Sequence, residues 1–416
     1  MGSEGGRAGP RRARHHVHRA VQDLVCARAH CADAQLCARD RVSPSPDTPP
    51  RVRGSGDDTD QRRLRVAVIG YGNSAAWVHC PLLRAAPDFD LAVVVATSRR
   101  AEERARADGL PVVRTAGEAA AFAPEVAVVC VPDQAHETFS LEAIAIGAHV
   151  SVEKPFAPDR VAAERVRNAA RRAGLRVSVF QNRRWDDDFL TAGALVRAGG
   201  LGDVTRYALR FADWRPEPGD GWRDRARSGQ LDGKLADLGS HLVDQAVCLF
   251  GPVRDVFADV RRMRPGVTVN DDCTLLLRHV SGVVGEVIAS AARPCLAPRI
   301  EVQGALGAYV SYGRDGQDTQ LRDGVLPGSA EWGRRGREPG TSSLIRPGAG
   351  AVDVERVPGN WLAYYEQFRE FVVRDGPAPV SMADALHVIE VLEAASASSA
   401  RGTRVSLPWP SSGAAS

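Results

Sequence analysis

The most unusual feature of the sequence is how little lysine it contains. Lys154 and Lys234 are the only lysines among 54 basic side chains, and arginine supplies the rest. Arginine can replace lysine wherever a generic positive charge suffices, but it cannot act as a compact amine that changes its protonation state. The two lysines are therefore candidates for a specific chemical role, and chance survival is the alternative.

The sequence also lacks long apolar segments and closely paired cysteines. No apolar run approaches the roughly 18–20 residues that cross a bilayer. The eight cysteines contain no Cys-x-x-Cys pair, so we expect no metal site. Cysteines scattered among apolar residues, such as Cys130, are typical of small buried side chains in a reducing compartment. We therefore expect a cytoplasmic protein without a membrane partner.

The positive charge is concentrated outside the regular part of the sequence. The formal net charge is +3, but residues 1–63 carry +4 and the remainder carries −1. A nucleic-acid-binding protein normally carries a basic stripe on its folded part, so we expect no nucleic-acid partner. We expect residues 1–63 to be a disordered extension or the product of a misassigned start codon.

From residue 64 the sequence alternates short β-branched runs with helical segments. We predict strands at 65–69, 91–96, 126–131, 149–152 and 176–180, with helices at 75–86, 101–107, 135–146 and 159–173 between them. This alternation is typical of a parallel sheet covered by helices on both faces. Residues 64–185 are therefore predicted to form a first domain of the α/β class.

Beyond residue 186 the strands follow one another without intervening helices. We predict helices at 189–197, 235–250, 361–374 and 382–401, strands at 204–211, 253–260, 272–279, 283–290 and 300–304, and a loop at 312–350. Consecutive strands favour a large, mostly antiparallel open sheet with helices on one face. Residues 186–410 are therefore predicted to form a second α/β domain, whose last helices can pack back on the first.

A glycine-rich turn follows the first predicted strand. Residues 70–75 fit G-x-G-x-x-A and lie between a strand and a helix. The first glycine allows a tight turn, the second lets the backbone approach a pyrophosphate, and the small alanine allows close packing. The helix N-terminus stabilises the phosphate charge. We therefore expect the dinucleotide to be held by Gly70, Tyr71, Gly72, Asn73, Ser74 and Ala75.

The end of the second predicted strand indicates which dinucleotide binds. An NAD-preferring site usually has an acidic residue there for the ribose 2′-hydroxyl. Here the sequence reads Thr97-Ser98-Arg99-Arg100, and a hydroxyl followed by guanidinium groups suits a 2′-phosphate. Two solvated arginines at a helix start are the alternative. We expect Ser98, Arg99 and Arg100 to bind NADP, with NAD as the second choice.

Two further motifs lie at the carboxyl edge of the predicted parallel sheet, where open α/β folds bind ligands. Pro132, Asp133 and His136 follow one strand, and Glu153 and Lys154 follow the next. We expect all five residues to contact the cofactor. The Lys154 amine can also bind a substrate hydroxyl and stabilise the alkoxide that forms as hydride leaves. An ion pair with Glu153 is the plainer alternative.

The predicted helix at 235–250 carries an acid and a histidine four residues apart. Asp237 and His241 therefore share a face of this helix. The histidine can take a proton from an alcohol near neutral pH, and the carboxylate can orient its ring. Asp244 lies near the same face, so a metal triad is conceivable, although a hydride carrier makes a metal unnecessary. An ordinary surface pair is the alternative.

Together these motifs resemble the glucose–fructose oxidoreductase/inositol dehydrogenase/MocA (Gfo/Idh/MocA) family. The ordered set is G-x-G-x-x-A, V-P-D-x-x-H, E-K-P and D-x-x-x-H, with further similarities at residues 181–185, at 304–307 and at Asn360-Trp361-x-x-Tyr364-Tyr365. The resemblance covers residues 64–407 and is greatest to the branch of NADP-linked scyllo-inositol dehydrogenases. Asp133 replaces the usual asparagine, and Lys234 interrupts a glycine-rich segment.

The resemblance implies that residues 64–185 form a Rossmann dinucleotide-binding domain. It also implies reversible oxidation of a secondary alcohol of a sugar, sugar derivative or inositol with NAD or NADP. It implies that His241 is the base, that Asp237 orients it and that Lys154 binds the reacting oxygen. It also implies a homo-oligomer formed through the second sheet. Arg183 and Arg184 are interpreted either as substrate or cofactor contacts or as surface charges. The alternative functions are a non-catalytic dinucleotide-binding regulator and a reductase of imines or linear tetrapyrroles.

Overall fold

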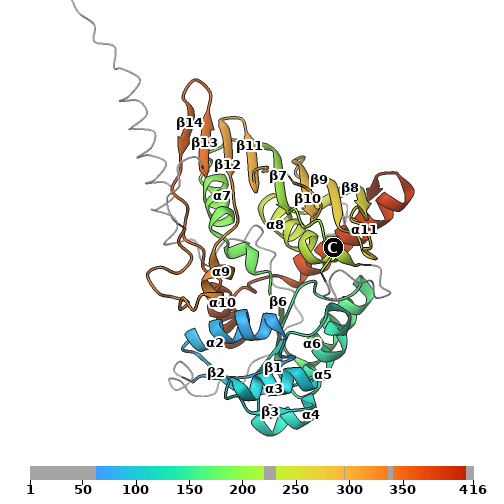
Figure 1. Cartoon of the computed structure of the whole chain (residues 1–416), viewed down its shortest axis with the longest axis vertical. Coiled ribbons are helices and arrows are strands. Elements are labelled where there is room, and N and C mark those ends of the chain that lie inside the picture. Colours follow the sequence, from blue (N-terminus) through green and yellow to red (C-terminus); the bar gives the residue numbers. More distant parts are fainter. Residues whose placement is uncertain (1–61, 220–230, 295, 336–340, 409–416) are drawn as a thin grey trace, which may run out of the picture.

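The computed structural model describes residues 62–219, 231–294, 296–335 and 341–408, which form two sheets with helices packed around them (Figure 1). Of the predicted N-terminal extension, all but Arg62 and Arg63 lie outside these ranges. Within the described ranges, no helix has both the length and the apolar character needed to cross a membrane.

The first sheet has six parallel strands in the order β3-β2-β1-β4-β5-β6, as expected for a doubly wound dinucleotide-binding fold. The strands are β1 (Leu64–Ile69), β2 (Phe89–Val95), β3 (Val112–Val113), β4 (Val126–Val129), β5 (His149–Val152) and β6 (Val177–Val179). Valine, isoleucine and alanine dominate β1 and β4, which are buried at almost every position. The chain order reverses between β1 and β4, so a crevice is expected at their carboxyl ends.

Local sequence signals set the ends of several helices around this sheet. The helices are η1 (Ala75–His79), α2 (Cys80–Ala85), α3 (Arg99–Ala107), α4 (Ala116–Ala119), η2 (Ala120–Phe122), η3 (Asp133–Ala135), α5 (His136–Ala145) and α6 (Arg160–Ala173). Helix α6 begins where the Asp159 side chain accepts the N–H of Ala162 at 2.8 Å, and it ends at Gly174 with a φ of +66°. The segment η1 is π-helical, a rare form that is often found at functional sites.

The second sheet has nine strands in the order β14-β13-β12-β11-β7-β10-β9-β8-β15. The strands are β7 (Val204–Ala212), β8 (Val253–Arg261), β9 (Asp272–His279), β10 (Val284–Ser290), β11 (Ile300–Gly304), β12 (Gly307–Ser311), β13 (Ser342–Arg346), β14 (Gly350–Asp353) and β15 (Val405–Ser406). Neighbouring strands pair antiparallel except β7 and β10, which pair in parallel. The prediction of a mostly antiparallel sheet is therefore confirmed.

Helices cover one face of the second sheet. They are α7 (Asp187–Arg197), α8 (Ser240–Phe250) and α11 (Met382–Arg401), and Figure 1 shows α7 and α8 lying across its strands. A π-helical segment, η6 (Leu235–Gly239), leads into α8, and a 3₁₀ turn, η4 (Asn182–Trp185), precedes α7. The predicted helix 235–250 is therefore divided into a π-helical and an α-helical part.

The predicted loop at 312–350 is wrong in part. It contains α9 (Gln317–Arg322) and β13, and β14 begins at its last residue. Strand β13 is only five residues long and depends on antiparallel pairing with β12. Its conformation is therefore set by a partner distant in the sequence, whereas the surrounding Gly- and Arg-rich segment has no strand signal of its own.

The C-terminal helices return to the first sheet. Tyr364, Tyr365 and Phe368 of α10 (Leu362–Val373) join the apolar core of β1, β2 and α2. Phe180, which follows β6, meets the ring of Tyr364 edge-on with centroids 4.8 Å apart. Helix α11 packs on α8 and β8 and also contacts α6. The two sheets are therefore joined by packed helices as well as by the chain.

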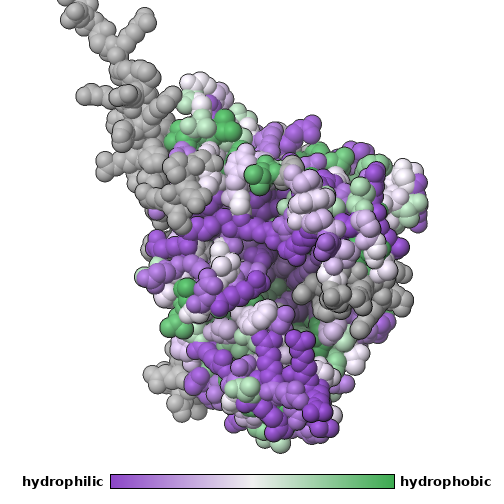
Figure 2. Space-filling model, viewed as in Figure 1, coloured by the Kyte–Doolittle hydropathy of each residue, from purple (hydrophilic) through white to green (hydrophobic). Residues whose placement is uncertain are grey.

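The described surface is hydrophilic over most of the face shown in Figure 2, with apolar side chains in small separate groups. Two of the exposed large apolar residues, Phe257 on β8 and Leu276 on β9, are cross-strand partners. They form an apolar pair on the side of the second sheet that faces solvent.

Candidate active site

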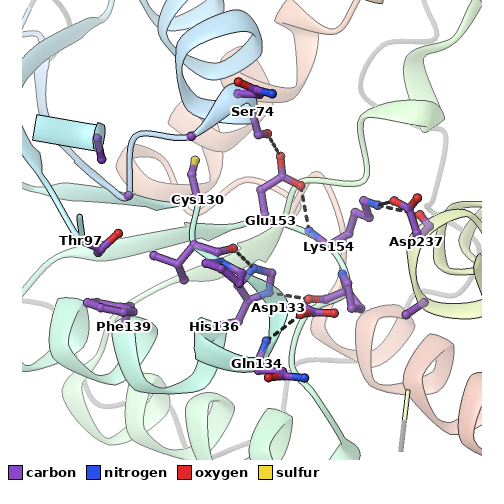
Figure 3. A pocket seen from close by; sticks show the side chains of 18 of the residues that line it. Ser74, Thr97, Cys130, Asp133, Gln134, His136, Phe139, Glu153, Lys154 and Asp237 are labelled. Atoms are coloured by element: carbon purple, nitrogen blue, oxygen red, sulfur yellow. Dashed lines mark hydrogen bonds and ion pairs between the residues drawn. The ribbon is translucent and has the colours of Figure 1, made fainter. Parts of the chain in front are cut away.

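A cleft of about 770 Å³ opens at the carboxyl ends of the parallel strands. Its walls come from the glycine-rich turn after β1, from the segments after β2, β4 and β5, and from residues 231–237 at η6 (Figure 3). A volume of this size is ordinary for a pocket that binds a small molecule or cofactor. The predicted cofactor edge therefore coincides with a cleft that both parts of the chain line.

The two glycines of the turn have different structural roles. Gly70 has a φ of +85°, and a Cβ atom there would meet the carbonyl oxygen of Cys130 at 2.8 Å. At Gly72 a Cβ atom would meet nothing within 4 Å. Gly72 therefore leaves open space beside the start of η1, which has no acidic residue in its first turn. This turn fits a pyrophosphate, whose approach a side chain at Gly72 would obstruct.

The other residues of the turn are divided between the cleft and the core. Asn73 and Ser74 line the cleft, whereas Ala75 is buried where the helix packs on the sheet. Tyr71 also lines the cleft although most of its side chain is buried, and its hydroxyl donates to Oδ2 of Asp108 at 2.8 Å. Burial raises the pKa of Tyr71. The backbone of Tyr71 can face a cofactor, but its hydroxyl is hydrogen-bonded to Asp108 at the C-terminal end of α3.

The arginines after β2 point in different directions. Ser98 and Arg100 line the cleft. The side chain of Arg99 is 91% exposed and pairs with Glu103 at 2.8 Å, outside the lining of the cleft. Arg104, which is not among the predicted cofactor contacts, lines the cleft one helical turn later. The i, i+4 spacing from Arg100 is the signal that could have identified it.

His136 joins two loops at the cleft rather than presenting its nitrogens to it. Its Nδ1 lies 2.7 Å from the carbonyl oxygen of Pro155, and its Nε2 lies 3.0 Å from that of Val131. Burial lowers the pKa of His136. Pro132 and Asp133 line the cleft beside it. The histidine thus holds the loops after β4 and β5 in place.

Lys154 lies opposite Asp237 across the cleft (Figure 3). Its Nζ donates to Oδ1 of Asp237 at 3.0 Å and to the carbonyl oxygen of the same residue at 2.6 Å. Nζ of Lys234 donates to Oδ2 of Asp237 at 3.2 Å. Both lysines of the sequence therefore bind one carboxylate. Glu153 accepts the backbone N–H of Lys154 at 3.1 Å.

His241 is a buried histidine on α8 whose ring is held by Gln181. Nδ1 lies 2.9 Å from Oε1 of Gln181, which can only accept a hydrogen bond, so Nδ1 carries the proton and Nε2 is the basic nitrogen of the neutral ring. Burial lowers the pKa of His241 well below its usual value, and the charges of Lys154 and Arg183 lower it further. The ring is therefore neutral at pH 7. No local sequence pattern predicts the pairing of His241 with Gln181.

Arg184 and Asp244 form a buried ion pair that neither interpretation of Arg184 predicted. Two N–H···O contacts of 2.7 Å join them, and each side chain is 1% exposed. Asp244 therefore binds an arginine instead of completing a triad with the acid–histidine pair. Arg183 packs over the ring of Trp361 at 4.8 Å, so surface charge is the wrong description of both arginines. Among the described residues, no group of three His, Cys, Asp or Glu side chains could hold a metal ion.

Both parts of the chain match known oxidoreductase domains. Residues 64–181 match the oxidoreductase family with an NAD-binding Rossmann fold, and residues 189–310 match the GFO/IDH/MocA C-terminal domain. These two segments contain most of the strands and helices that form the cleft. The family expected from the motifs is therefore found at the level of whole domains.

Individual relatives agree with this result. The uncharacterized oxidoreductase YdgJ of Escherichia coli is 33% identical over 341 residues, covering 79% of this chain and 94% of that protein. The scyllo-inositol 2-dehydrogenase (NADP(+)) IolW of Bacillus subtilis is 32% identical over 340 residues, covering 81% and 94%. The solved structure of YvaA from Bacillus subtilis has a TM-score of 0.77 and 30% identity, covering 84% of this chain and 99% of that one. The chain belongs to the Gfo/Idh/MocA family of NAD(P)-binding oxidoreductases.

Proposed function

We propose that the protein catalyses the reversible NAD(P)-dependent oxidation of a secondary alcohol in a sugar, sugar derivative or inositol. The observation that carries this proposal is a buried, neutral His241 close enough to Lys154 for the ammonium charge to lower its pKa. A base and a hydrogen-bond donor beside a cofactor cleft are the groups that alcohol oxidation requires. The name of the relative IolW supports the polyol class.

Each residue of the site has a defined task in this proposal. Nε2 of His241 takes the hydroxyl proton of the substrate. A dinucleotide held in the cleft would accept the hydride on its nicotinamide ring. Lys154 donates to the reacting oxygen and stabilises the negative charge that develops on it. Asp237 holds Nζ of Lys154 through the 3.0 Å ion pair. The orientation of His241 that the family resemblance assigns to Asp237 falls instead to Gln181. Gln181 fixes the histidine tautomer through its 2.9 Å hydrogen bond.

The first experiment follows the absorbance of reduced nicotinamide with the purified protein, NADP or NAD, and a panel of inositols and aldoses. We expect reduction with at least one polyol, and we expect His241→Ala to abolish it. The same variant should retain cofactor binding, because His241 is not among the residues that line the cleft. Tight cofactor binding without turnover on any panel member would favour the regulatory alternative.

For the cofactor we propose a preference for NADP over NAD. Ser98, Arg100 and Arg104 supply a hydroxyl and two guanidinium groups at one end of the cleft, which suits a 2′-phosphate. Replacing both Arg100 and Arg104 by Ala should lower kcat/KM for NADP relative to NAD by about 100-fold, since each charged contact is worth about a factor of ten. Arg106→Ala is the matched control on α3, because that arginine pairs with Glu102 and lies outside the cleft lining. An unchanged ratio in the double variant would contradict the preference.

The remaining expectations from the sequence are also proposals. We propose two domains, residues 64–185 and 186–410, in a cytoplasmic protein without a nucleic-acid partner. We further propose a homo-oligomer formed through the exposed side of the second sheet, where Phe257 and Leu276 lie side by side. Light scattering should give a mass that is a multiple of 44.6 kDa, and Leu276→Glu should reduce that mass. A monomeric wild-type protein would contradict this proposal.

A further inference from the structure

His79 is a fully buried histidine that none of the predicted motifs includes. It is the last residue of η1, the segment that begins beside the glycine-rich turn. Its Nδ1 lies 2.5 Å from the hydroxyl of Tyr365, and its Nε2 lies 3.0 Å from Oε1 of Glu153. Its ring packs on Phe180 with centroids 4.3 Å apart. Both nitrogens of this buried ring thus have polar partners, one on α10 and one after β5.

The chemistry of the partners sets the direction of the hydrogen bonds. An ionised carboxylate can only accept, so Nε2 of His79 donates to Glu153. In the neutral ring Nδ1 then has a lone pair, and the Tyr365 hydroxyl donates to it. The hydrogen bonds therefore run in one direction, from Tyr365 to His79 and from His79 to Glu153. The tyrosine hydroxyl favours the tautomer of His79 that carries its proton on Nε2 and can donate it to the carboxylate.

Glu153 links this buried chain to the cleft. The Ser74 hydroxyl of the glycine-rich turn donates to Oε1, and the backbone N–H of Lys154 donates to Oε2 at 3.1 Å (Figure 3). Burial raises the pKa of Glu153, but the hydrogen bond from His79, the charge of Lys154 and the hydrogen bond from Ser74 outweigh burial and leave the pKa lowered. One ionised carboxylate therefore fixes both the turn that faces the pyrophosphate and the residue that carries the catalytic amine.

We propose that His79 is a positioning residue for this cleft, and that Tyr365 and His79 together orient Glu153 so that Ser74 is held for cofactor binding and Lys154 is held for its role in turnover. This inference rests on the proposed function and gives a role to the second tyrosine of the W-x-x-Y-Y motif. Tyr365 is completely buried in α10 and does not line the cleft, and its hydroxyl bonds to His79. The effect on the cofactor is therefore indirect, and it passes through one histidine and one carboxylate.

The chain offers a matched control for the tyrosine. Tyr364 is the preceding residue of α10 and is equally buried, but its hydroxyl is 2.9 Å from Oγ of Ser151 within β5. Tyr364→Phe and Tyr365→Phe each remove one buried hydroxyl from the same helix turn. Their effects on thermal stability should therefore be similar. Only Tyr365→Phe removes a donor to His79.

The test measures the Kd of NADPH, and in parallel of NADH, by fluorescence titration of the full chain, with a melting curve for each variant. We expect His79→Leu to weaken binding of the preferred cofactor by about tenfold, as loss of a hydrogen bond to a charged group implies. His79→Gln retains an N–H donor and should bind within about threefold of wild type. Tyr365→Phe should weaken binding by about threefold, and Tyr364→Phe should not change it.

Two results would overturn the inference. One is wild-type affinity in a folded His79→Leu variant, and the other is an equal loss of affinity in the two tyrosine variants. If His79→Leu does not fold, the comparison of the two tyrosines and the rescue by His79→Gln decide the question. A failure of the proposed function looks different, because the wild-type protein would then bind cofactor without turning over any polyol.

Discussion

Nζ of Lys154 lies 3.0 Å from Oδ1 of Asp237, so an ion pair joins the end of a parallel strand to the π-helical segment η6. The two residues are separated by 83 positions in the sequence. Both residues line the cleft, so their contact links the wall formed by the six-stranded sheet to the wall formed by η6. Because Oδ2 of the same carboxylate binds Lys234, Asp237 is held from both sides.

Removing the amine of Lys154 should affect turnover far more than cofactor binding. We expect Lys154→Ala to lower kcat by about 100-fold or more, the usual cost of losing a donor to a developing oxyanion. The Kd of NADPH should change by about threefold or less. This is well below the factor of ten that a loss of about 1.4 kcal/mol of binding free energy would produce. Steady-state kinetics and fluorescence titration separate the two effects.

Lys234→Ala serves as the comparison for this prediction. It also removes an ammonium group from Asp237, but it leaves the 3.0 Å contact of Lys154 in place. We expect its kcat to fall by about tenfold or less, as for one hydrogen bond to a charged group. Equal losses of kcat in the two variants would show that charge near Asp237 matters and that Lys154 has no separate role.

The pH dependence of alcohol oxidation should reflect the low pKa of His241. The base is active when neutral, so activity is lost as pH falls through the pKa of the folded protein. Because burial and the charges of Lys154 and Arg183 place that pKa well below the usual value of about 6.5, kcat/KM should stay level through pH 6.5 and decline only at lower pH. Arg183→Gln removes one of the charges and should move the decline to higher pH. A wild-type decline centred at or above pH 6.5 would contradict this assignment.

Substitution of Gly70 should affect the stability of the fold, whereas substitution of Gly72 should affect cofactor binding. Gly70→Ala forces a Cβ atom to within 2.8 Å of a carbonyl oxygen at a φ of +85°, so we expect a lower melting temperature. Gly72→Ala meets no neighbour within 4 Å, so the melting temperature should remain near that of wild type. The new methyl group nevertheless occupies the pyrophosphate approach, and NADPH should bind at least about tenfold more weakly. Retained affinity in a folded Gly72→Ala variant would place the phosphates elsewhere.

The buried ion pair between Arg184 and Asp244 should contribute to the stability of the fold rather than to catalysis. Asp244→Ala leaves the Arg184 charge in the core and should destabilise the protein by about 3–5 kcal/mol, measured by urea unfolding. Asp384→Ala removes a longer, partly exposed contact of 3.2 Å to the same arginine and should cost about 1 kcal/mol. The double variant Arg184→Met with Asp244→Leu should recover part of the loss, since no unpaired charge remains in the core and Asp384, which loses Arg184, is partly exposed to water. Equal costs for Asp244→Ala and Asp384→Ala would refute this ranking.

Helix ends with local signals could be predicted from the sequence. The predicted helix 382–401 has the bounds of α11, because Ser381 caps its start and Gly402 ends it in the left-handed conformation. Strand β13 could not be predicted, because its five residues become a strand only through pairing with β12. The π-helical segments η1 and η6 follow the glycine-rich turn and Lys234, and their apolar spacing does not distinguish them from α-helix.

The parts of the site that sequence could predict are those fixed by strand order. Lys154 follows a parallel strand next to the one that precedes His136, so both were expected at one edge of the sheet. The pairing of His241 with Gln181 and that of His79 with Tyr365 depend on how helices pack across 60 and 286 positions of sequence. No local pattern encodes such contacts, and a buried histidine in an apolar helix resembles any other core residue until its neighbours are known.

The position of α10 has a consequence for how the protein is made. The ring of Tyr365 in α10 contacts the rings of His79, Phe89 and Phe180. These three residues lie at least 185 positions earlier in the sequence. A nascent chain that has emerged from the ribosome only through residue 185 can pair its six strands. The rings of Phe89, Phe180 and His79 cannot yet pack against Tyr365, because α10 has not been synthesised. The cofactor-binding half therefore reaches its final packing only when nearly the whole polypeptide has been synthesised.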